Sequence, residues 1–129
     1  MKLILFNKVI CEGTKEECEA FRIDLIKTLH RMGNELERIY PNKRIGTHEE
    51  YFEELKTLNP FVYETLSYFK EVAGEYLVNI YFDHIDLIGV RIWVYDDLET
   101  KTKRGYSFAN ILLTIAYGRR KQNFWKIEE

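Results

Sequence analysis

The sequence is poor in cysteine and contains no long apolar stretch. Its two cysteines, Cys11 and Cys18, do not have CxxC spacing, and no second pair exists to complete a zinc site of the usual kind. The N-terminal apolar run, residues 3–6, is too short for the hydrophobic part of a signal peptide. No segment approaches the ~18 apolar residues that a membrane span needs. We therefore expect two buried free thiols in a cytoplasmic protein with no membrane association.

Glycine and proline are also scarce, at seven and two residues. The glycines are isolated, so no glycine-rich phosphate cradle is present, and the sequence predicts no cofactor. The three histidines, His30, His48 and His84, fall in three different predicted elements. None of them accompanies a serine or cysteine elbow. The sequence therefore does not indicate nucleophilic catalysis.

Hydrophobic and aromatic residues are abundant instead. They make up 46% and 15% of the chain, whereas disordered chains are poor in aromatic and β-branched residues. A globule of this length buries roughly two-thirds of its unfolded surface. The composition predicts a single folded domain over residues 1–129.

Capping signals place a long helix early in the chain. Thr14 and Glu17 have the spacing of a capping box, in which each side chain bonds a free N–H group of the first turn. Apolar residues then recur at helical spacing and predict a helix over 15–39. Pro41 should end it, because the residue before proline is kept out of the helical conformation.

Two more helix starts follow. Thr47 and Glu50 form a second predicted capping box, which opens a short helix. At Asn59-Pro60 the chain begins a third helix, with asparagine as the cap and proline at the first helical position. Gly74 has the position that ends this helix. The middle of the chain is therefore predicted to be helical, with a joint at 59–60.

The apolar period changes from 3.6 to 2 after the third helix. Alternation over 76–82 and again over 88–94, with a short polar connection, predicts an antiparallel hairpin. Residues 3–10 are predicted to be a first strand, and 124–127 a short closing strand. Residues 96–105 are predicted to be a polar connection.

Residues 106–117 fit two structures. They have helical spacing, with Ser107 as a cap and Gly118 as a stop, but their alternation also fits a third long strand, and short apolar runs do not decide between these. The order of elements predicts an α+β fold of two layers. In it, an N-terminal strand and helices are followed by an antiparallel sheet, one face of which is covered by helices.

Charge is unevenly distributed, although the net charge is only −2. Residues 98–129 hold seven Lys and Arg against three Glu, a local +4. Basic and aromatic residues interleave there, a pattern that can neutralise phosphates and stack bases. The alternative is a solvated tail whose cations complement a helix dipole. The candidate ligand-binding residues are Lys101, Lys103, Arg104, Arg119, Arg120, Lys121 and Trp125.

Asp83, His84 and Asp86 are the candidates for a metal site. Carboxylates and an imidazole in one turn could hold Mg²⁺, Mn²⁺ or Zn²⁺ and serve a metal-dependent hydrolase. Aspartate is also a residue that turns favour for structural reasons. Asp96 and Asp97 lie at the far end of the next predicted strand, too far along it to share the site.

Taken together, these features predict a binding protein rather than an enzyme. We expect non-enzymatic docking on a macromolecular partner, in the first instance a protein. An inhibitor or adaptor of phage or mobile-element type would have this size and composition. Nucleic-acid or nucleotide binding through the basic-aromatic C-terminal segment is the second hypothesis, and a metal-dependent hydrolase is the third.

Overall fold

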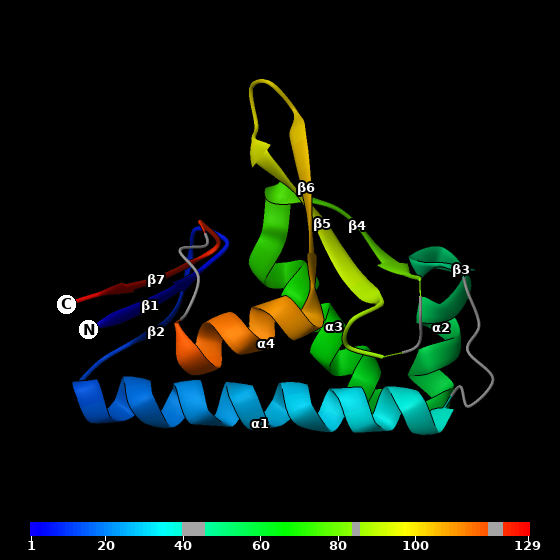
Figure 1. Cartoon of the computed structure of the whole chain (residues 1–129), viewed down its shortest axis with the longest axis horizontal. Coiled ribbons are helices and arrows are strands. Elements are labelled where there is room, and N and C mark those ends of the chain that lie inside the picture. The colour runs from blue at the N-terminus through cyan, green and yellow to red at the C-terminus, as the bar shows by residue number, and fades with distance from the viewer. Residues whose placement is uncertain (40–45, 84–85, 119–122) are drawn as a thin grey trace.

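The computed structural model of the chain describes residues 1–39, 46–83, 86–118 and 123–129 (Figure 1). Its strands are β1 (Lys2–Leu5), β2 (Lys8–Glu12), β3 (Gly46–Thr47), β4 (Leu77–Phe82), β5 (Val90–Asp97), β6 (Thr102–Ser107) and β7 (Trp125–Glu128). Its helices are α1 (Lys15–Ile39), α2 (His48–Leu58), α3 (Pro60–Ala73) and α4 (Phe108–Tyr117), with the short 3₁₀ helix η1 (Gly74–Tyr76) before β4.

The predicted two-layer α+β class is confirmed, with the strands divided between two antiparallel sheets. One sheet has the order β2-β1-β7 and the other the order β3-β4-β5-β6. The expected single strand over 3–10 is a hairpin, because Phe6 and Asn7 turn the chain with φ angles of 50° and 67°. Turns with two positive φ angles usually carry glycine, so this turn has no recognisable sequence signal.

The predicted hairpin of 76–82 and 88–94 is confirmed as β4 and β5, and a further strand extends it. The expected polar connection over 96–105 is wrong, since β5 continues to Asp97 and β6 begins at Thr102. Charged side chains are tolerated in β6 because it is the last strand of its sheet. The hairpin of β5 and β6 projects beyond the helices (Figure 1).

The long helix over 15–39 has the predicted bounds, and the ambiguous segment 106–117 is mainly helix α4. The Ser107 hydroxyl caps α4 by accepting the N–H of Asn110 at 3.0 Å, and Gly118 ends it in the left-handed conformation. Although α1 has 25 residues, neither it nor any other described helix is long and apolar enough to cross a membrane.

The predicted start of α3 is confirmed, and it connects two helices. Asn59 is buried; its Oδ1 accepts the N–H of Val62 at 3.2 Å, and its Nδ2 donates to Glu35 of α1 at 2.7 Å. The cap therefore fixes α3 against α1. Three positions of the predicted helix boundaries lie outside what the structure describes, namely Pro41 and the side chains of Thr47 and Glu50.

One hydrophobic core joins the helices to a single face of the larger sheet. The core residues of its strands are Ile80, Phe82, Val90, Ile92, Val94 and Tyr106. Within the same core, Phe69 of α3 and Phe108 of α4 meet edge to face, with ring centroids 5.0 Å apart. Successive residues of a strand point to opposite faces, so the residues between these core positions face away from the helices.

Asn59→Ala should lower the free energy of unfolding by about 2 kcal/mol, the upper end for loss of a cap. The loss is large because Glu35 also loses its amide donor. Thr14→Ala is the matched control: it removes the exposed cap of α1, whose Oγ1 accepts the N–H of Glu17 at 3.1 Å, and should cost about 1 kcal/mol. Urea unfolding measures both values, and equal losses would contradict the joining role of Asn59.

Candidate functional site

The structure places the predicted basic and aromatic residues on two different sheets. Lys101, Lys103 and Arg104 share the β5–β6 hairpin, at its turn and in β6. Trp125 belongs to β7 of the smaller sheet, where it is half-buried and packs against the core. The remaining three predicted residues lie outside the described residues: Arg119, Arg120 and Lys121.

The two neighbouring cations of β6 lie on opposite faces of the sheet. Arg104 is opposite Val94, a core position, and its Nε contacts Asp96 Oδ2 at 2.9 Å. Lys103 is opposite Tyr95, on the other face. Within the described residues, Lys103 makes no ion pair. Of the two, only Arg104 therefore has its charge compensated by a carboxylate.

The predicted metal candidates have structural partners where they are described. Asp83 faces Arg91, with 3.7 Å between Oδ2 and Nε. Asp86 closes the turn before β5, because its Oδ1 accepts the N–H groups of Ile88 and Gly89 at 3.0 and 2.8 Å. His84 lies outside the described residues. Among the residues that the structure describes, no three His, Cys, Asp or Glu side chains gather as metal ligands would.

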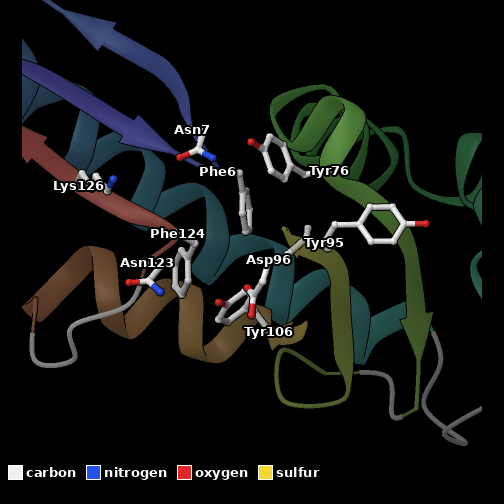
Figure 2. A pocket seen from close by; sticks show the side chains of 10 residues that line it. Phe6, Asn7, Tyr76, Tyr95, Asp96, Tyr106, Asn123, Phe124 and Lys126 are labelled. Carbon is white, nitrogen blue, oxygen red and sulfur yellow. The ribbon is translucent and has the colours of Figure 1, made fainter. Parts of the chain in front are cut away.

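An open pocket of about 230 Å³ lies between the two sheets (Figure 2). Three of its five aromatic lining residues pack together: Phe6 stacks on Phe124 with centroids 5.6 Å apart, and Tyr106 contacts Phe124 at 4.5 Å. The N–H of Phe6 donates to the carbonyl of Phe124 at 2.8 Å, so the turn between β1 and β2 is fixed to the start of β7. The contact of Tyr106, from β6, with the Phe124 ring joins this part of the chain to the larger sheet.

The pocket also has polar lining residues. They are Asn7, Asp96, Asn123 and Lys126. Small-molecule sites usually enclose about 300–1,000 Å³, so a pocket of about 230 Å³ suits a single side chain or ring better than a whole cofactor. The pocket therefore has room for a single side chain or ring.

Tyr106 forms part of the pocket wall, and its environment disfavours the phenolate. Burial raises the pKa of its phenol above the ordinary value, and the nearby Asp96 carboxylate raises it further. The Arg104 guanidinium acts in the opposite direction. The hydroxyl therefore remains a neutral donor across the physiological range.

The second candidate surface is the face of the larger sheet that points away from the helices. Three aromatic side chains lie there outside the core, Tyr81 in β4 and both Trp93 and Tyr95 in β5. Tyr81 is 37% exposed, and the other two are half-buried. Figure 2 shows the ring of Tyr95 pointing away from the pocket, on the far side of β5. We call these three residues the aromatic face.

Trp93 lies flat on the backbone of the neighbouring strand. It is paired with Gly105, and a Cβ added to that glycine would meet Trp93 Cε2, Cζ2 and Cδ2 at 2.8, 2.9 and 3.0 Å. Cε2 is shared by the two rings of the indole, so its in-plane directions are occupied by ring atoms. Another atom can come this close to it only from above or below the ring plane. One face of the ring therefore rests on Gly105, and the other points away from the sheet.

Three cations border the aromatic face, and we call them the basic rim. Arg91 is opposite Tyr81, and Lys103 is opposite Tyr95. Lys101 sits in the β5–β6 turn with a φ angle of 59°, and its Nζ lies 4.8 Å from the centroid of the Tyr95 ring. Two of the three rings thus have a cation directly opposite on the neighbouring strand, whereas Trp93 lies between Asn79 and Gly105.

Sequence reasoning identified Lys101 and Lys103 but missed the rest of this surface. The alternation that predicts β5 places Arg91, Trp93 and Tyr95 together opposite its apolar residues. Large aromatic residues on the polar side of a half-buried strand are the signal that could have located the surface. A comparison of the chain with protein-family models, curated proteins and solved structures finds no match.

Tyr106→Phe should make stability less sensitive to alkaline pH. The raised pKa means that the folded chain holds the phenol proton more tightly than the unfolded chain. The resulting stabilisation is complete below about pH 10 and is lost as the pH rises through the folded-state pKa. Unfolding free energies measured across this range should fall more steeply for the wild type than for the variant. Parallel pH profiles would contradict the buried environment of Tyr106.

Proposed function

We propose that the protein is a non-enzymatic binding module that docks on a macromolecular partner through the aromatic face. The observation that carries the proposal is the position of Tyr81, Trp93 and Tyr95 on the side of the sheet opposite the core. Binding energy in interfaces concentrates on a few aromatic and arginine side chains. An aromatic surface that folding leaves outside the core is therefore a natural docking site.

Shape also supports docking on a large partner. The β5–β6 hairpin projects beyond the helices (Figure 1), and its aromatic side is the one that faces away from the core. Trp93 rests on Gly105, and a ring held in this way loses little conformational freedom on binding. Its preorganisation lowers the entropic cost of association.

A role as inhibitor or adaptor of phage or mobile-element type stays a prediction within this proposal. It requires a partner complex whose activity changes on docking. The aromatic face supplies a surface for such contact, and the small pocket on the other side of β5 offers room for one further anchoring side chain.

Site-specific photo-crosslinking tests the docking function. The photoreactive residue p-benzoylphenylalanine replaces Tyr95 in one variant and Ile23 in another. Ile23 is the matched control because it is 45% exposed but lies on α1. After irradiation in an extract of the native cells, we expect a discrete protein or nucleic-acid adduct from position 95 and none from position 23. Equal adducts at both positions, or none at either, would refute docking through the aromatic face.

A further inference from the structure

We propose that the macromolecule bound by the aromatic face is single-stranded nucleic acid. Its bases would stack on the aromatic face, and its phosphates would contact the basic rim. The inference rests on the proposed docking function and names the partner class at the same surface. It does not require the pocket between the two sheets.

The orientation of Trp93 is the first argument. Base stacking needs an aromatic ring that presents a free face, and Trp93 turns one face to Gly105 and the other away from the sheet. Among the described residues, neither Trp93 nor Tyr81 contacts another aromatic ring. Stacking tolerates any base, because every base has a π face.

The spacing of the rings is the second argument. Trp93 and Tyr95 are two residues apart on β5, a separation of about 7 Å along an extended strand. Tyr81 pairs with Arg91 and is therefore the diagonal neighbour of Trp93 across the sheet. The three rings form a continuous track that crosses from β4 to the tip of the β5–β6 hairpin. A single strand can lie along such a track with its bases unpaired.

The placement of charge is the third argument. Lys103 lies opposite Tyr95, and Lys101 lies over its ring, so both ammonium groups are beside a stacking position. Lys101 adopts a positive φ angle of 59° at a turn position that would favour glycine. The backbone at Lys101 is therefore strained, and this turn position is the one from which its ammonium group reaches the aromatic face. Arg91 completes the rim, since its guanidinium is only loosely paired, 3.7 Å from Asp83.

The same features favour single strands over duplexes. In a duplex the bases are stacked on one another and present only their edges, whereas the aromatic face offers flat rings. A protein partner could also use the three aromatic residues, but the cations opposite Tyr81 and Tyr95 place positive charge beside the rings, where the phosphates of a stacked strand would lie. Protein docking is therefore an outcome that the experiment must be able to reveal.

Fluorescence measurements with short labelled oligonucleotides test the inference. The background is Trp125→Phe, which leaves Trp93 as the only tryptophan of the chain. The probes are oligothymidylate, oligouridylate and an abasic strand of the same length. We expect the two base-containing strands to bind and to quench Trp93, and the abasic strand to bind at least tenfold more weakly because stacking is lost. The relative affinities of the two base-containing strands distinguish DNA from RNA.

Variants separate the two faces of the hairpin. Trp93→Leu or Tyr95→Leu should weaken oligonucleotide binding by about tenfold. For three phosphate contacts, a plot of the logarithm of affinity against the logarithm of salt concentration should have a slope of about −2. Lys103→Gln should reduce the magnitude of that slope by about 0.7. Arg104→Gln is the matched control, because Arg104 is adjacent in β6 but lies on the other face, paired with Asp96. It should change neither the affinity nor the slope.

The outcomes distinguish this inference from the docking function. Equal binding of the abasic strand, or equal effects of Arg104→Gln and Lys103→Gln, would overturn stacking on the aromatic face. If no oligonucleotide binds at low salt while crosslinking at position 95 yields a protein adduct, docking stands and the nucleic-acid inference fails. If neither occurs, both fail. Tyr95→Leu controls for misfolding of Trp93→Leu, since Tyr95 lies near the tip of the hairpin, away from the core.

Discussion

Within the described residues, the larger sheet turns one of its faces to the core, and most of the structure follows from this constraint. Ile80, Ile92 and Tyr106 enter the core from three adjacent strands. The period of two then fixes every intervening side chain on the opposite face. A slip of one residue in the pairing of β5 would exchange Val94 for Trp93 in the core. The same packing that stabilises the sheet therefore also orders the aromatic face.

The smaller sheet depends on a separate contact. Phe6, in a left-handed conformation, stacks on Phe124, while Tyr106 reaches the same cluster from the larger sheet. A left-handed conformation is costly for a bulky residue, and burial of the Phe6 ring in this cluster offsets it. The first and last strands of the chain are thereby held beside the core, and the pocket is the space that remains between the two sheets.

Much of the fold could be predicted from local rules. Capping residues at Thr14, Asn59 and Ser107 mark helix starts that the structure confirms, because a cap acts within a single turn. The turn at Phe6 and the strand β6 could not be predicted in this way. Phe6 has a conformation that depends on a distant partner, Phe124. In β6, a charged sequence forms a strand because it pairs with β5.

The candidate site was predictable to a smaller degree. Local charge drew attention to the last quarter of the chain, and Lys101 and Lys103 do border the aromatic face. Charge counting could not separate Lys103 from Arg104, because only the register of β6 assigns them to opposite faces. Charge counting also did not point to Trp93, because residues 65–97 have a net negative charge. The register of the strands therefore locates this candidate surface better than the composition of the chain does.

The most direct test of the account compares the two tryptophans during binding. In a titration of the isotopically labelled wild type with single-stranded oligonucleotide, nuclear magnetic resonance resolves the indole N–H groups of Trp93 and Trp125. The account predicts that the Trp93 signal shifts and saturates with the added strand, while the Trp125 signal, from β7 of the other sheet, stays in place. A shift of Trp125 with Trp93 unmoved would contradict it.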